Sequence, residues 1–273
     1  MQQTKIYYLC SEVAPFSNTY ELSTFSQKIS KILHEYDDIE IRLSQPKYGY
    51  ISERKYILRE VIRLKDMLID FKGEQELVNM KSAFIPNSRV QIYFTENEKY
   101  FKSLTELIYK SKNGRPISDI DLRFALFSKI CLESLKLLFW VPDILVCNDW
   151  QTSLVPYLLK EKFSSDEFYK NVKSVFILHS LNQFKNIGLE SLASLDLPLD
   201  KSNDIIDGTE LAFKYSDFII FANKDILSEV KKQKNLSKLL NKNNHCTLNI
   251  STQSEKSPWK EAAEAIYSKL IKL

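Results

Sequence analysis

Hydrophobic and polar positions near the amino terminus follow a pattern that predicts a strand, a loop and a helix. Residues 5–10 (KIYYLC) form a short β-prone run, and after a loop the apolar positions between Leu22 and Leu33 recur at helical spacing. The segment 39–45 (IEIRLSQ) alternates in polarity and ends at Pro46, as a second strand that runs into a loop would. The first elements are therefore expected in the order β-α-β.

The pattern changes between residues 56 and 94. Alternating segments without a helical period predict a β-hairpin insertion there, followed by another strand of the main sheet. The segment 118–140 begins with Ser and Asp and then places apolar residues at helical spacing. It predicts a long helix that ends before Pro142.

Short apolar runs alternate with amphipathic segments in the second half of the chain. The runs 143–149 (DILVCND), 174–180 (SVFILHS) and 218–223 (FIIFAN) are expected to be buried strands with helices between them. Parallel neighbours in a sheet need crossover connections, which helices supply. We therefore predict an α/β fold with one doubly wound, mostly parallel sheet and helices on both faces.

Composition divides the chain into three parts. Residues 1–233 are expected to form the domain, and residues 234–257, rich in Lys, Asn and Ser, to form a polar linker. Residues 258–273 are expected to form a carboxyl-terminal amphipathic helix that packs back on the domain, with Pro258 in its first turn.

Charge and cysteine content narrow the class of protein. A net charge of +3, from 38 basic and 35 acidic residues, gives no electrostatic basis for a nucleic-acid partner. The four cysteines are scattered without a CxxC pair, which favours reduced thiols and a cytoplasmic location. We see no export signal at the amino terminus and no apolar stretch of the roughly 20 residues that a membrane span requires.

Several kinds of catalytic or cofactor site find no support in the sequence. The five glycines are too far apart for a GxGxxG or GxxxxGK phosphate loop. Of the three histidines, His34 falls on a predicted helix and His245 in the predicted linker, so metal-ligand spacing is lacking. No nucleophile elbow supports a Ser-His-Asp triad. We therefore predict no metal and no cofactor.

Candidate ligand-binding residues follow from the predicted sheet. In open parallel sheets, ligands bind in the crevice at the carboxyl ends of the strands. The segments just past those ends are 11–19, 46–49, Asn97, 148–150 and 179–180.

The same segments carry a family resemblance. The blocks, in order, are SEVAPF (11–16), PKYG (46–49), RFALFSK (123–129), W-x-PDILVCNDWQTSLVP (140–156) and ILHSLNQ (177–183). In this order and spacing, over roughly the first 225 residues, they resemble the bacterial glycogen synthases and plant starch synthases. The resemblance implies the GT-B architecture, in which two Rossmann-like domains face each other across a cleft. It also implies transfer of glucose from ADP-glucose to the non-reducing end of an α-1,4-glucan, with this chain as the N-terminal, acceptor-side half.

Two departures from the family pattern matter. Where the family has K-T-G-G-L, this chain has Asn18-Thr19-Tyr20-Glu21-Leu22, so a bulky ring and a carboxylate replace the glycines. Phosphate affinity at that loop is expected to fall, and ADP-glucose binding to be weak or absent. The family's C-terminal domain, which supplies most donor contacts, does not follow here, so we expect no glucose transfer by this chain alone. The closing helix resembles the family's last helix, and whether it is a remnant of that helix stays open.

The resemblance assigns candidate catalytic roles to two residues. Asp149 and His179 match positions that line the donor–acceptor cleft, where an imidazole can hydrogen-bond a glucose hydroxyl and a carboxylate can accept from another hydroxyl or orient a loop. The structural alternatives are a helix cap for Asp149 and a backbone-satisfied imidazole for His179. The candidate substrate-binding residues are Asn18, Thr19, Tyr48, Asn148, Trp150 and Ser180. Tyr48 and Trp150 can stack on a sugar, although core packing is the stronger reading for Trp150.

Two functions remain open on these grounds. One is glucan synthesis in glycogen metabolism, with a partner chain supplying the donor domain. The other is a non-catalytic module that binds an α-glucan or maltooligosaccharide, or a regulatory module whose open cleft face is covered by a protein partner. An unrelated small-molecule-binding protein is disfavoured by the series of motifs.

Overall fold

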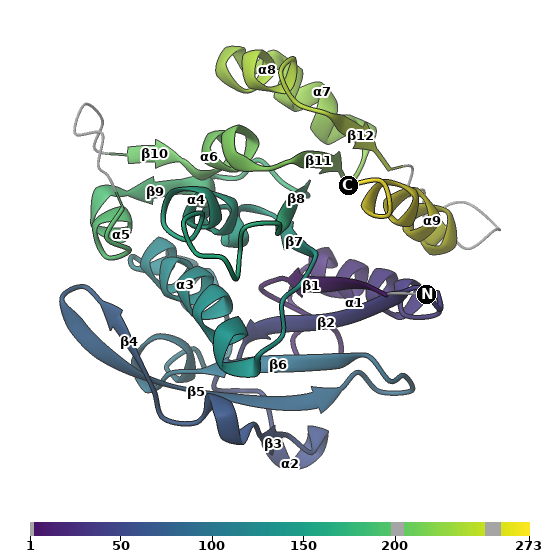
Figure 1. Cartoon of the computed structure of the whole chain (residues 1–273). Helices are drawn as coiled ribbons and strands as arrows, with labels where there is room; N and C mark the ends of the chain where they lie inside the picture. The colour runs from purple at the N-terminus through teal and green to yellow at the C-terminus, as the bar shows by residue number, and fades with distance from the viewer. Residues whose placement is uncertain (1–2, 198–204, 249–257) are drawn as a thin grey trace.

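A mixed sheet forms the centre of the computed structural model, which describes residues 3–197, 205–248 and 258–273. Its strand order is β12-β11-β8-β7-β1-β2-β6-β5-β3, with β4 paired to β5, and the strands from β12 to β6 run parallel (Figure 1). The parallel strands are β1 (Thr4–Leu9), β2 (Ile39–Pro46), β6 (Gln91–Glu96), β7 (Ile144–Asn148), β8 (Lys173–Leu178), β11 (Phe218–Phe221) and β12 (His245–Thr247). The predicted α/β class is confirmed.

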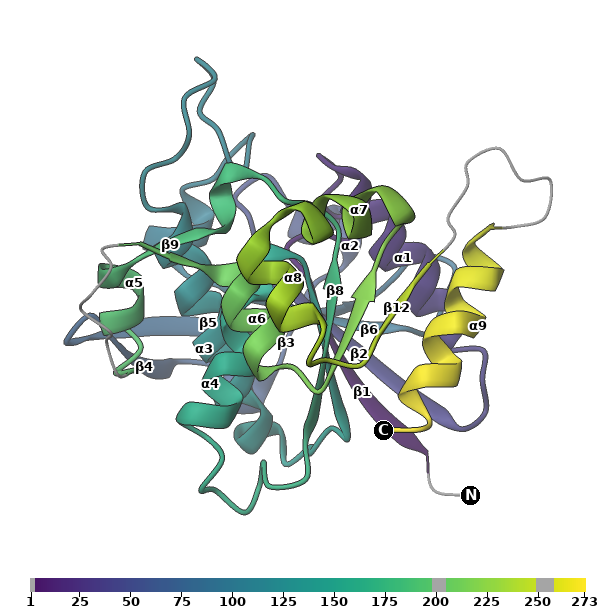
Figure 2. The same cartoon turned by 90° about the horizontal axis from the view of Figure 1, so that it is seen from above.

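Helices cover both faces of the sheet. Figure 2 shows α1 and α9 on one side and α3, α4 and α6 on the other. The helices are α1 (Glu21–Leu33), α2 (Glu53–Tyr56), α3 (Ile120–Leu138), α4 (Leu154–Glu161), α5 (Leu189–Ala193), α6 (Gly208–Tyr215), α7 (Lys224–Lys232), α8 (Lys234–Leu240) and α9 (Pro258–Leu270). Because β7 lies between these layers, every one of its residues is buried, which explains its continuous apolar run.

The predicted hairpin insertion is formed by antiparallel strands at one edge of the sheet. Its strands are β3 (Arg59–Glu60), β4 (Met67–Phe71) and β5 (Glu74–Phe84), and β5 pairs with β6. Along β4, buried and exposed residues alternate, as expected for a strand with one face on the core. A separate small sheet joins β9 (Asn186–Gly188) to β10 (Ile205–Asp207).

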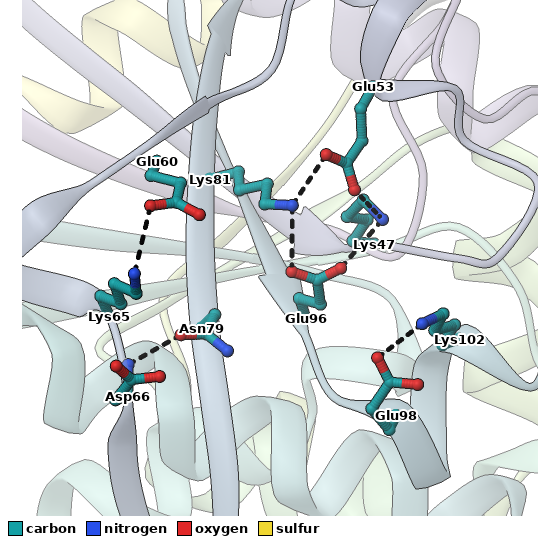
Figure 3. A network of polar contacts seen from close by, with 10 residues as sticks. All are labelled: Lys47, Glu53, Glu60, Lys65, Asp66, Asn79, Lys81, Glu96, Glu98 and Lys102. Carbon is teal, nitrogen blue, oxygen red and sulfur yellow. Dashed lines mark hydrogen bonds and ion pairs between the residues drawn. The ribbon is translucent and has the colours of Figure 1, made fainter.

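A network of ion pairs ties this insertion to the main sheet (Figure 3). Lys47, at the end of β2, lies 2.8 Å from Glu53 and 3.0 Å from Glu96. Lys81 of β5 contacts the same two carboxylates at 2.8 and 3.4 Å. The side chain of Lys47 is only 7% exposed, and the two carboxylates compensate the cost of removing its ammonium group from water. The network therefore fixes the loop after β2, which belongs to the PKYG block.

The region predicted to be a polar linker contains regular structure. Helix α8 occupies 234–240, and β12 adds a parallel strand beyond β11, so the sheet continues past residue 233. Residues 249–257, the rest of the predicted linker, lie outside the described residues. In α8 the two leucines four residues apart, Leu236 and Leu240, are buried. The Lys and Asn residues around these leucines made the segment look too polar to predict a helix.

The closing helix α9 packs against α1. The rings of Tyr36 and Tyr267 stack at 4.0 Å with an angle of 5° between their planes. The Tyr267 hydroxyl donates to Asp38 at 2.7 Å, and Trp259 meets Phe25 edge to face at 6.3 Å. Through Phe25, this helix reaches the residues at the carboxyl end of the sheet that are described next.

Candidate functional site

The carboxyl ends of β1, β7 and β8 bring the predicted site residues together. Strand β1 lies between β2 and β7, so the chain winds away from β1 in both directions. In sheets of this kind the loops on either side of that point diverge and leave a crevice for a ligand. Here Tyr109 hydrogen-bonds the loops after β1 and β7, and Asp149 after β7 hydrogen-bonds the loop after β8.

The loop after β1 is organised by the buried carboxylate of Glu12. It accepts hydrogen bonds from the main-chain nitrogens of Thr19 (3.3 Å) and Tyr20 (3.0 Å), which directly precede α1. It also accepts from the hydroxyls of Ser17 and Thr19. Burial raises the pKa of Glu12, and these hydrogen bonds act in the opposite direction. The main-chain N–H groups of Thr19 and Tyr20 are thus satisfied by the protein itself.

Two residues of this loop have side chains with distinct surroundings. The amide oxygen of Asn18 accepts a hydrogen bond from the Ser23 hydroxyl at 2.5 Å. The ring of Tyr20 is 50% exposed and leans on Tyr109 with 5.0 Å between ring centroids. Tyr20 therefore places an aromatic surface at the position where the family pattern has its first glycine.

Asp149, just past β7, orients the loop after β8. Its Oδ1 accepts from the main-chain nitrogens of His179 (3.1 Å) and Ser180 (2.9 Å), and its Oδ2 accepts from the Ser180 hydroxyl at 2.7 Å. It does not cap the helical turn that follows it. Its φ of 59° and ψ of −175° lie in a region that favours glycine. Burial raises the pKa of Asp149 to about 6, against the effect of its hydrogen bonds.

The imidazole of His179 is held against two neighbours. Its Nε2 lies 3.2 Å from the amide oxygen of Asn148, and its ring meets Phe25 edge to face at 4.5 Å. Burial lowers the pKa of His179 to about 3, so the ring is neutral at physiological pH. A neutral imidazole offers one donor and one acceptor, a combination suited to an uncharged hydroxyl ligand.

The remaining aromatic candidates lie inside the protein. Tyr48 is fully buried, and its hydroxyl donates to the main-chain oxygen of Ser11 at 2.8 Å. Trp150 is 4% exposed and stacks on Phe184 at 5.7 Å. In this structure both rings support the loops at the carboxyl ends of the strands and leave no free face for a sugar. For Trp150 this agrees with the core-packing alternative.

The structure thus brings Asn148, Asp149, His179 and Ser180 into one hydrogen-bonded group. Asn18 and Thr19 lie on the loop around Glu12. Sequence reasoning named neither Glu12 nor Tyr109 as a functional residue, although Glu12 belongs to the SEVAPF block. Tyr109 hydrogen-bonds Ser11 at 2.9 Å and Gln151 at 2.8 Å, so it links the loops that follow β1 and β7. The sequence around Tyr109 has no motif that marks it.

Comparison with known proteins identifies the family. The family model described as the starch synthase catalytic domain matches residues 5–242. The chain belongs to this family. This starch synthase domain is 30% identical to the glycogen synthase of Pelodictyon phaeoclathratiforme, over 98% of this chain and 56% of the relative. It is 34% identical to that of Chlorobium chlorochromatii, over 71% of this chain and 39% of the relative. The chain therefore spans about half the length of the curated relatives it matches.

Solved structures show the same fold. The catalytic domain of starch synthase IV from Arabidopsis thaliana, bound to ADP and acarbose, matches with a TM-score of 0.73 and 19% identity, over 90% of this chain and 51% of that one. A sucrose-phosphate synthase structure from Thermosynechococcus elongatus matches with a TM-score of 0.53 and 10% identity, over 98% of each chain. The GT-B relationship predicted from the motifs is confirmed, and this domain is glycogen-synthase-like.

The described part of the starch synthase domain provides neither a metal cluster nor a membrane-spanning helix. In the described ranges, no three His, Cys, Asp or Glu side chains are grouped to hold a metal ion. No helix in that part of the chain is long and apolar enough to cross a bilayer.

The raised pKa of Asp149 leads to a prediction about stability and pH. The folded protein binds this proton more tightly than the unfolded chain, so the contribution of Asp149 to stability falls as pH rises from about 4 to about 6. The neutral variant Asp149→Asn lacks this effect. We expect the difference in free energy of unfolding, variant minus wild type, to rise by up to about 3 kcal/mol between pH 4 and pH 7.

Denaturation in urea at several pH values measures this difference. Because only the difference between the two proteins is used, contributions from other groups, such as the depressed pKa of His179, cancel. Parallel stability curves for wild type and variant would show that Asp149 titrates as it does in the unfolded chain.

Proposed function

We propose that this domain is the acceptor-side lobe of a glycogen-synthase-type glucosyltransferase and that its carboxyl edge holds an α-1,4-glucan. Support comes from the family and from the chemistry of the edge. His179 is neutral, Ser180 has a hydroxyl and Asn18 an amide, and groups of this kind match the hydroxyls of a sugar. His179 is the group proposed to contact the glucan, with Ser180 beside it and Asn18 and Thr19 on the loop after β1 as further proposed contacts.

Asp149 acts on this site indirectly in our proposal. Both of its carboxylate oxygens are already engaged by residues 179 and 180. It is therefore a positioning residue that sets the loop carrying His179. Tyr48 and Trp150 support the neighbouring loops from within the core.

The observation that carries the proposal is the engagement of Glu12. Free amides at a helix amino terminus attract phosphate. The Glu12 carboxylate lies on the amides of Thr19 and Tyr20 just before α1, and Glu21 is an acidic side chain in the first turn, so two carboxyl groups lie where a phosphate would approach. We infer that this lobe binds ADP-glucose weakly and that glucose transfer needs a donor lobe. That lobe would come from the same polypeptide or from a partner chain.

We further propose that the protein works in the cytoplasm. The cysteines Cys10, Cys131, Cys147 and Cys246 are all free thiols, and the first three are buried. Reduced, dispersed cysteines are usual in that compartment.

Calorimetry with maltoheptaose tests the proposal. We expect measurable binding to the wild type and about tenfold weaker binding to His179→Ala, since one hydrogen bond to a half-buried group is lost. His245→Ala is the matched control, because His245 is exposed and lies at the amino-terminal end of the outermost strand β12, away from the carboxyl ends of the strands. Absence of binding, or equal loss in both variants, would contradict a glucan site at this edge.

A further inference from the structure

The side-chain amide of Asn148 is held in one orientation by its surroundings. Its Nδ2 donates to the main-chain oxygen of Leu9 at 3.0 Å, and that oxygen can only accept. Its Oδ1 faces the other way, where the Tyr8 hydroxyl donates to it at 3.0 Å. A flipped amide would set two oxygens against each other in the buried interior, at the cost of an unmade hydrogen bond. The amide orientation is therefore fixed.

This orientation determines which nitrogen of His179 carries the proton. Oδ1 of Asn148 is an acceptor, so the 3.2 Å contact with Nε2 of His179 requires a proton on Nε2. The low pKa of His179 leaves the ring with a single proton at neutral pH. Nδ1 therefore keeps its lone pair.

We propose that Asn148 is a positioning residue that holds His179 in the Nε2–H tautomer, so that Nδ1 is the acceptor available to a ligand hydroxyl. The Phe25 ring and the bond from the His179 main-chain nitrogen to Asp149 keep the imidazole in place. The assignment of the ligand rests on the proposed function, whereas the tautomer rests on the free protein alone.

The tautomer of His179 affects which ligands can bind at Nδ1. A sugar hydroxyl donates a hydrogen bond, so it pairs with the Nδ1 lone pair. An ionised phosphate oxygen can only accept, so the same lone pair repels it. Together with the carboxyl groups of Glu12 and Glu21 at the start of α1, this favours a neutral, hydroxyl-rich ligand over a nucleotide diphosphate.

Nitrogen-15 NMR of the histidine rings tests the tautomer directly. The protein has three histidines, so the His179 signals can be assigned with His34→Gln and His245→Ala variants. We expect the proton on Nε2 and constant ring shifts from pH 5 to pH 8. Asp149 accepts a hydrogen bond from the His179 main-chain nitrogen, and the Asp149→Asn variant shows whether its titration disturbs the shifts.

Two substitutions separate positioning from simple packing. In Asn148→Leu, or the smaller Asn148→Ser if the first does not fold, we expect ring shifts that move toward the average of the two tautomers. We also expect about tenfold weaker maltoheptaose binding, as for the loss of one hydrogen bond. Tyr8→Phe removes only the second donor to Oδ1, so the tautomer is expected to persist.

The possible outcomes bear on different claims. A proton on Nδ1, a ring that titrates between pH 5 and pH 8, or unchanged shifts in the Asn148 variants would overturn the positioning role. If the wild type shows the expected tautomer but binds no maltoheptaose, the positioning role is supported and the proposed function is contradicted.

Discussion

Replacing Gly49 by alanine is expected to lower the free energy of unfolding by about 3 kcal/mol, because there is no room for a side chain. An added Cβ would lie 2.2 Å from the main-chain oxygen of Lys102 and 3.3 Å from that of Leu104. The Gly49 nitrogen donates to the Leu104 oxygen at 2.9 Å, so the two segments cannot separate without losing that bond. Urea denaturation of the variant measures the loss.

Gly73→Ala is the matched control for this prediction. A Cβ at Gly73 meets nothing within 4 Å, but the residue has a φ of +74°. Its replacement should cost only the strain of a left-handed alanine, about 1 kcal/mol. Equal losses in the two variants would show that close backbone packing is not the reason for glycine in the PKYG block.

Asp149→Ala is expected to cost about 3 kcal/mol and to weaken glucan binding. The substitution leaves two main-chain N–H groups, of His179 and Ser180, without their acceptor, and each such loss costs about 1 kcal/mol or more. The Ser180 hydroxyl also loses its acceptor, whereas alanine keeps the strained φ of 59° and ψ of −175° that Asp149 already has, so strain adds nothing to this cost. Denaturation and calorimetry report the two effects separately.

Asp149→Gly separates the strain from the hydrogen bonds. Glycine removes the same carboxylate but adopts this backbone conformation freely. We therefore expect it to be more stable than the alanine variant by about 1 kcal/mol while binding glucan as weakly. A glycine variant no more stable than the alanine variant would mean that no strain is stored at residue 149.

The sequence predicted the main elements because their signals are local. The buried run of β7 and the polar alternation of the hairpin insertion can be read from neighbouring residues. The strand β12 has only three residues, and its place in the sheet depends on pairing with β11, which no local pattern encodes. The polar composition around it therefore led to the prediction of a linker.

The sequence predicted where the site residues lie in the fold, but not which residues they contact. Strand ends placed Asp149 and His179 at one edge, and the structure shows them bonded there. The sequence left helix capping and loop orientation both open for Asp149, because its left-handed φ cannot be read from its type alone. The Glu12 contacts depend on how the loop folds back to Tyr20, which only the tertiary structure shows.

The central claim is that this edge is built for a neutral sugar chain and not for a diphosphate. Its most direct test is calorimetry of the unmodified domain with ADP and with maltoheptaose in the same buffer. We predict a dissociation constant for ADP at least about ten times that for maltoheptaose, a difference of about 1.4 kcal/mol. Tighter binding of ADP than of the oligosaccharide would contradict the claim.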